Sequence, residues 1–240
     1  MIKSKADVSD VYPTQQHLLV LENSWFPTMN KTVLVALIFV DLILIALHIG
    51  AGAYFDKIPT LLNIAFDYSL GEFFGYAKWA AIIVLLWIVS RRTGNPALLA
   101  CAALFAVMLA DDSLRIHEQL GEVAVNAEVV GTASWANRQS LGEIAVWAAL
   151  ALLLFPVVLF GFVKSTRQQW VPALRFLGLI CLFVVFGGVI DALHQPVANL
   201  PFGPQLADLV EDGGEMIVGS LIVAHAVALW HATPKAGGSQ

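Results

Sequence analysis

Long apolar runs alternate with short polar segments along most of the chain, and this pattern predicts membrane-spanning helices. A helix needs about 20 apolar residues to cross the roughly 30 Å hydrocarbon core of a bilayer. The segments that satisfy this requirement are 31–51, 70–90, 95–116, 140–163, 172–194 and 208–230. We therefore expect an all-α polytopic bundle of six transmembrane helices within residues 31–231. Residues 1–30 are expected to lie along the cytoplasmic interface, and 232–240 to form a cytoplasmic tail.

The composition agrees with this pattern and excludes several classes of protein. The 240 residues are 58% hydrophobic and only 13% charged, about half the charged fraction of ordinary soluble domains. A net charge of −5 offers no basic face for nucleic acid. Cys101 and Cys181 lie inside apolar runs, so neither a disulfide framework nor a zinc ribbon is indicated. The expected surroundings are a lipid bilayer.

The basic residues predict the orientation of the bundle. If both termini are cytoplasmic, that side carries nine basic residues: Lys3, Lys5, Lys31, Arg91, Arg92, Lys164, Arg167, Arg175 and Lys235. The opposite side carries four: Lys57, Lys78, Arg115 and Arg138. This difference follows the positive-inside rule, which places an excess of lysine and arginine in cytoplasmic loops.

The acidic residues gather in the other half of the predicted bundle. Fourteen of the 18 fall there: Asp56, Asp67, Glu72, Asp111, Asp112, Glu118, Glu122, Glu128, Glu143, Asp191, Asp208, Glu211, Asp212 and Glu215. A carboxylate at the centre of a membrane helix costs about 2.5–3.5 kcal/mol, so those inside spans are usually paired or functional. Every span brings at least one acid or histidine to this half, which predicts a shared polar pocket open to the outside.

The third and fifth spans carry the densest polar patterns. The third ends ADDSLRIHEQLGE, and one stripe of a continuous helix is expected to hold Asp111, Arg115, Glu118 and Glu122. Ser113 and His117 form an i,i+4 pair beside it. Near the end of the fifth span, Asp191 and His194 are three residues apart, a spacing at which a carboxylate and an imidazole can bind one metal.

The remaining spans complete the predicted pocket. The sixth begins ADLVEDGGEMIVGS, where Glu211, Asp212 and Glu215 stand close together around two glycines. Unneutralised carboxylates this close repel one another, so protons, a metal ion or an arginine must compensate. The other spans add Asp41, His48, Glu72 and Glu143.

A metal centre is the first hypothesis for this pocket, because histidine with several carboxylates suits zinc, iron or manganese. The expected ligands are His117, Asp191, His194, Glu211 and Glu215, with Asp111 and Asp112 as bridging or supporting groups. The expected remainder of the pocket is Asp41, His48, Glu72, Glu143 and Asp212. A bound metal would activate a water molecule beside a carboxylate base, for which Glu118 is placed, and hydrolysis of a lipid-like or amphipathic substrate would follow.

Two resemblances bear on this hypothesis. The element from Ser113 to His117 is similar to the Ser-x3-His element of the alkaline ceramidase and adiponectin-receptor superfamily, which consists of seven-span zinc hydrolases. That resemblance implies a catalytic role for Ser113. The chain departs from the family in having six spans, Glu128 where the family has an aspartate, and His225 and His231 at the wrong spacing for a His-x3-His pair.

The second resemblance covers most of the spans. ADDSLRIHEQLG together with LVEDGGEMIVG resembles an uncharacterised group of bacterial multi-pass membrane proteins with D-[DE]-x4-H-E and E-[ED]-x-x-E elements. It implies a protein of the bacterial cytoplasmic membrane and no particular activity.

Two other functions stay open. Asp41, His48, Asp191, His194 and Glu215 could form a proton or cation pathway of the kind found in transporters, although the cytoplasmic half is apolar. The chain could also be an accessory subunit of an oligomer or of a larger membrane complex.

Overall fold

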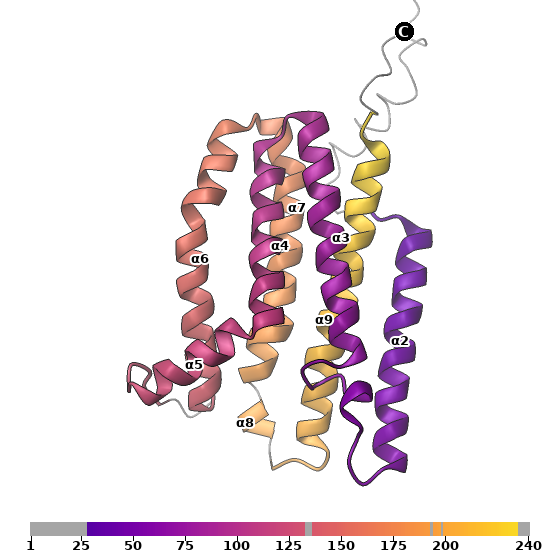
Figure 1. The fold of residues 1–240 in the computed structure, drawn as a ribbon, viewed down its shortest axis with the longest axis vertical. Helices are drawn as coiled ribbons and strands as arrows, with labels where there is room; N and C mark the ends of the chain where they lie inside the picture. Colours follow the sequence, from indigo (N-terminus) through magenta and orange to yellow (C-terminus); the bar gives the residue numbers. More distant parts are fainter. Residues whose placement is uncertain (1–27, 133–135, 193, 198, 235–240) are drawn as a thin grey trace, which may run out of the picture.

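The computed structural model describes residues 28–132, 136–192, 194–197 and 199–234, and every regular element in them is helical (Figure 1). Six helices in this part of the chain are long and apolar enough to cross a membrane. They are α2 (Lys31–Tyr54), α3 (Leu70–Thr93), α4 (Pro96–Leu114), α6 (Arg138–Lys164), α7 (Arg167–Val184) with its π-helical continuation η3 (Val185–Ile190), and α9 (Gly203–Ala232). The shorter elements are η2 (Thr60–Leu62), α5 (Ile116–Asn126) and α8 (His194–Val197). The prediction of an all-α, six-span membrane protein is confirmed; the interfacial segment and the tail predicted at the termini lie almost wholly outside the described residues.

Capping residues explain where the long helices end and the chain turns back. The α3 helix ends at Gly94, whose φ of 60° is favourable for glycine. Asn95 then caps α4 by accepting hydrogen bonds from the backbone N–H groups of Ala97 and Leu98. Thr166 and Gln169 form a capping box at the start of α7. The α3–α4 and α6–α7 connections are therefore both tight.

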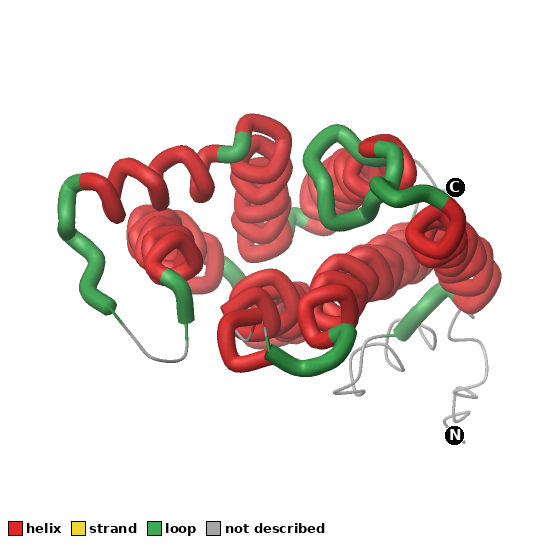
Figure 2. The backbone as a smooth tube through the Cα atoms, turned by 90° about the horizontal axis from the view of Figure 1, so that it is seen from below, coloured by secondary structure: helices red, strands yellow, loops and turns green. Residues whose placement is uncertain are grey.

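The long helices alternate in direction, so the bundle has two distinct ends. We call the end that holds Lys31 and Ala232 the terminal end, and the end that holds α5 and α8 the distal end (Figure 1). Seen along the bundle, α5 lies across the helix ends rather than along the bundle (Figure 2).

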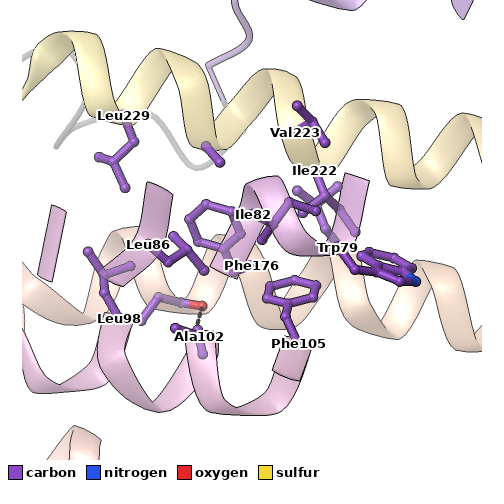
Figure 3. Close-up of a cluster of buried hydrophobic side chains, with 14 of the residues drawn as sticks. Trp79, Ile82, Leu86, Leu98, Ala102, Phe105, Phe176, Ile222, Val223 and Leu229 are labelled. Carbon is purple, nitrogen blue, oxygen red and sulfur yellow. Dashed lines mark hydrogen bonds between the residues drawn. The ribbon is translucent and has the colours of Figure 1, made fainter. Parts of the chain in front are cut away.

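The apolar core occupies the terminal half. Side chains from α3, α4, α7 and α9 pack there, including Ile82, Leu86, Phe105, Phe176 and Ile222, each with no exposed surface (Figure 3). In the outer helices α2 and α6, only 6% of the residues in the most apolar stretch are buried inside the protein. Their exposed faces are apolar, as expected for helices in contact with lipid.

The third span is shorter than the sequence predicts, and the expected stripe of charges along it is wrong. Helix α4 stops at Leu114, and Arg115 takes a left-handed conformation with φ of 52° before α5 starts in a new direction. The Asp111 carboxylate caps this turn, since its Oδ1 accepts the backbone N–H of His117 at 2.9 Å. Glu118 and Glu122 therefore lie on α5 and share no stripe with Asp111.

Candidate functional site: a carboxylate cavity

A cavity of about 800 Å³ lies at the distal end, enclosed by α3, α4, α5, α6, α7 with η3, and α9. Nine carboxylate residues of the described chain line it: Asp67, Glu72, Asp112, Glu118, Glu143, Asp191, Glu211, Asp212 and Glu215. His117 lies among them. We call this space the carboxylate cavity. It brings together acids from α3, α4, α5, α6 and α9, from the end of η3, where Asp191 lies, and from the loop before α3.

The inner part of the cavity is apolar and aromatic. Trp79 and Phe183 line it and also belong to the buried core, so they form its floor toward the terminal half. Trp147 of α6 lines one wall, and its ring pair with His117 has a centroid distance of 5.5 Å. The cavity is therefore acidic near the helix ends, whereas further in its lining is mainly apolar and aromatic and includes Lys78.

A tight group of ligand-type side chains stands where α4 meets α5. Potential ligand atoms of Asp111, Asp112 and His117 all lie within 4.8 Å of one another. Asp111 is buried behind the cavity, and its Oδ2 is 2.9 Å from Nδ1 of His117. Asp112 lines the cavity and accepts a hydrogen bond from Nε1 of Trp79 at 2.9 Å. Each carboxylate is thus held in place by a neighbour.

The charges around His117 favour its protonated form. Burial by itself lowers the pKa of this imidazole, but the hydrogen bond with Asp111 and the negative charges of Asp111, Glu143 and Asp112 outweigh burial. The pKa of His117 is consequently raised above its ordinary value of 6.5. A metal ion bound to a ring nitrogen of His117 would take the place of the proton on that nitrogen.

Arg115 connects two acidic residues at the rim of the cavity. Its Nε lies 3.0 Å from Oδ2 of Asp67 and 3.0 Å from Oε2 of Glu118. This links the loop before α3 to the start of α5. Burial and the charge of Glu118 together raise the pKa of Asp67 against the opposing effects of Arg115 and His117.

Glu72 and Glu143 are held by polar neighbours on opposite walls. Glu72 accepts hydrogen bonds from the Tyr76 hydroxyl and from the backbone N–H of Tyr68. Glu143 accepts one from Nε2 of Gln139 at 2.7 Å. These hydrogen bonds orient Glu72 and Glu143, two of the acids that the sequence predicts in the pocket.

Glu215 enters the cavity past a glycine. A Cβ atom at Gly187 would lie only 1.8 Å from Oε1 of Glu215, so no other residue fits there without moving this carboxylate. Gly187 belongs to η3, and π-helical turns of this kind occur frequently at functional sites. Gly214 similarly makes room for the Phe186 ring, whose Cδ1 would be 2.1 Å from an added Cβ.

A buried ion pair lies beside the cavity, in the middle of the bundle. Nζ of Lys78 is 2.6 Å from Oδ1 of Asp41, and the two side chains are 3% and 0% exposed. The lysine also donates to the Met216 carbonyl at 2.8 Å, and Ser220 donates to Oδ2 of Asp41 at 2.5 Å. The pair attaches the peripheral helix α2 to α3 and α9.

The expected site residues fall into two groups. Those that line the cavity are Glu72, Asp112, His117, Glu118, Glu143, Asp191, Glu211, Asp212 and Glu215. Four described residues do not: Asp41 faces Lys78, His48 accepts the backbone N–H of Ile64 at 3.3 Å, Asp111 lies behind His117, and the Ser113 hydroxyl donates to the Ala110 carbonyl at 3.4 Å. The side chain of His194 lies outside the described part of the structure. His225 and His231 do not line the cavity and lie near the terminal end of α9.

Several cavity residues were absent from the sequence-based site: Asp67, Tyr76, Lys78, Trp79 and Trp147. A signal for Lys78 existed, because it is a lone lysine inside the second span and Asp41 is a lone acid inside the first. Two opposite charges at similar depth in adjacent spans are expected to pair. The aromatic residues carried no such signal, since apolar spans contain many of them.

A family model matches residues 33–232, which extend from α2 to the end of α9. The chain belongs to the family described as a domain of unknown function (DUF8692). The match includes every element that lines the carboxylate cavity. Comparison with curated proteins gives no match, and comparison with solved structures gives none either. The resemblance to the alkaline ceramidase and adiponectin-receptor superfamily therefore stays a prediction.

Proposed function

We propose that this multi-pass membrane protein binds a divalent transition metal in the carboxylate cavity, with His117 and Asp112 at the centre of the site. The observation that carries the proposal is the group formed by Asp111, Asp112 and His117, whose potential ligand atoms lie within 4.8 Å of one another. Within this group Asp111 lies 2.9 Å from Nδ1 of the imidazole, so we assign it a supporting role and propose that Nε2 of His117 and the Asp112 carboxylate bind the metal. A carboxylate that orients a metal-binding histidine in this way is a recurrent feature of metal sites.

Further donors for the metal come from the helices on the other side of the cavity. Asp191, Glu211 and Glu215 line the same space as His117, and His194 stays among the expected ligands. One imidazole with several carboxylates suits zinc, iron or manganese. The excess of acids also supports a cation, because nine carboxylates in one cavity repel one another unless positive charge or protons compensate.

The cavity is proposed to face outward from the cytoplasmic membrane. The described termini lie at the opposite end of the bundle from the cavity, and the lysine and arginine excess places that terminal end inside. The apolar core between the two ends supports a closed pocket over a proton or cation pathway.

Hydrolysis of a lipid-like substrate is the chemistry that we propose for a metal held here. A bound metal supplies a water molecule of lowered pKa. Glu118 lines the cavity and is the carboxylate placed to accept a proton, while Arg115 fixes its position. Ser113 has no described contact with the cavity and is not needed for this chemistry.

Elemental analysis of the purified protein tests the proposal. We expect zinc, iron or manganese in the wild type, and loss of most of it in Asp112→Asn and His117→Ala. His231→Ala is the control, because this histidine is exposed at the terminal end and its loss is expected to leave the metal content unchanged. Equal metal content in the wild type and in both cavity variants would overturn the proposed site.

A further inference from the structure

Helix α5 starts at the level where the long helices end. The candidate membrane span of α4 runs to Leu114, and α5 begins at Ile116, so a single residue, Arg115, joins the two. The middle of α5 is held near the same level, because Gly121 packs against Gly142, four residues after the start of the α6 span. Four residues correspond to about 6 Å along α6, at 1.5 Å per residue. These two attachments hold α5 at the distal boundary of the bilayer.

The direction of α5 agrees with this position. The helix lies across the end of the bundle and runs along its periphery past α6 (Figure 2). Because the long helices cross the membrane, a helix that lies across their ends follows the membrane surface. The side of α5 that packs on the bundle carries Gly121, and His117 and Glu118 line the carboxylate cavity. The other side of α5 is therefore the one that meets the surroundings of the protein.

Apolar residues form one stripe on that outward side. Ile116, Leu120 and Val123 follow one another at spacings of four and three, which places them along one face of the helix. Leu120 is 49% exposed and Val123 is 62% exposed. Leu114, in the last turn of the α4 span, is also exposed. The apolar stripe of α5 thus continues the apolar surface of a membrane span.

Polar residues form a second stripe beside the apolar one. Gln119, Glu122 and Asn126 follow one another at spacings of three and four, and all three are exposed. A helix with separate apolar and polar faces that lies along a membrane surface is suited to the boundary between lipid headgroups and acyl chains. The polar stripe contains a carboxylate and no cation, so attraction to anionic lipid is not expected to contribute.

We propose that α5 is an interfacial helix that binds the lipid leaflet at the distal end. Its apolar stripe lies among the upper parts of the acyl chains, and its polar stripe lies in the headgroup layer. Lipid is the partner that the position favours, because α5 follows directly on one membrane span and packs within another. The rim of the carboxylate cavity, which includes Glu118 of α5, then lies at the level of the headgroups. This inference does not depend on a metal in the cavity.

Nitroxide accessibility in phosphatidylcholine nanodiscs tests the proposal. In a background of Cys101→Ala and Cys181→Ser, a spin label is attached to one new cysteine at a time. Labels at Leu120→Cys and Val123→Cys should collide mainly with oxygen, which concentrates in hydrocarbon, at a depth of about 5–10 Å into the headgroup and acyl-chain boundary. Labels at Gln119→Cys and Glu122→Cys should collide mainly with a water-soluble nickel chelate.

Two results of this measurement would overturn the proposal. Nickel accessibility at all four positions would place the apolar stripe in water. Low accessibility to both reagents at Leu120→Cys and Val123→Cys would mean that protein, such as a second copy of the chain, covers the stripe instead of lipid.

A pair of neighbouring aspartate variants tests whether the lipid contact stabilises α5. Leu120→Asp places a charge on the apolar stripe and is expected to speed hydrogen exchange in residues 116–126 in nanodiscs. Gln119→Asp is the control, because it adds the same charge one position away on the polar stripe, and it should exchange like the wild type. Both positions are exposed, so the bundle is expected to fold in each variant. Equal exchange in the two variants would contradict insertion of the apolar stripe.

Discussion

At the scale of single residues, the contact between Lys78 and Asp41 has the largest expected energetic effect. Both side chains are almost completely buried, and Ser220 and the Met216 carbonyl satisfy hydrogen bonds on either side of the pair. A buried ion pair contributes little net stability when compared with apolar residues of similar volume. Removing one partner is different, because it leaves an uncompensated charge in a medium of low dielectric constant.

The pair predicts a graded series of stabilities. Asp41→Ala and Lys78→Ala should each lower the free energy of unfolding by about 3–5 kcal/mol, the usual cost of a buried charge without its partner. The double substitution Asp41→Leu with Lys78→Met should recover most of that loss. Ser220→Ala should cost about 1 kcal/mol, since it removes one hydrogen bond. The free energy of unfolding of all four variants can be measured in detergent. A double variant that is no more stable than the single variants would contradict the pairing.

At the scale of helices, the approach of α5 to α6 decides the shape of the cavity rim. A Cβ at Gly142 would lie 2.6 Å from the backbone oxygen of Gly121, and one at Gly121 would lie 3.0 Å from the backbone nitrogen of Glu143. A Cβ at Gly142 would therefore force the two backbones apart, and one at Gly121 would require them to shift by a few tenths of an ångström. His117 and Glu118 on α5 and Glu143 on α6 depend on this contact for their separation.

Gly142→Ala should therefore separate α5 from α6 and lower the free energy of unfolding by about 1–3 kcal/mol, the usual cost of overpacking. Faster hydrogen exchange in residues 116–126 should accompany the loss. Gly178→Ala is the matched control, since it also lies inside a long helix but has nothing within 4 Å of an added Cβ. That substitution should be neutral or stabilise the protein by about 0.5–1 kcal/mol. Similar effects of the two substitutions would contradict the role of the glycine contact.

At the scale of the whole molecule, charge is separated between the two ends of the bundle. The carboxylate cavity lies at the distal end, whereas Arg91, Arg92, Lys164 and Arg167 lie where helices turn at the terminal end. The apolar core separates the two ends. If the terminal end faces the cytoplasm, as proposed, these basic residues satisfy the positive-inside rule.

Reporter fusions test this orientation directly. Fusions after Arg92 and after Lys164 should report a cytoplasmic location, and a fusion at Asn126 should report an external one. The reason is that the α3–α4 and α6–α7 turns lie at the terminal end, while α5 lies at the distal end. The opposite result at both ends would place the cavity on the cytoplasmic face.

Hydropathy and charge along the chain were sufficient to define the six spans and the end at which the acids gather. Both follow from the cost of burying backbone and charge in hydrocarbon, which depends on local composition. Spacing along a span was less informative, because it assumes an unbroken helix. The break at Arg115 is stabilised by Asp111, whose carboxylate reaches the backbone and ring of His117, and this contact redirected Glu118 and Glu122.

Only the tertiary packing decided which acids share the cavity. Asp41 and Glu215 are both acids inside spans, yet Asp41 is neutralised by Lys78 while Glu215 passes Gly187 to reach the cavity. The rotation of each helix and its neighbours determine these outcomes, and neither can be read from one segment alone.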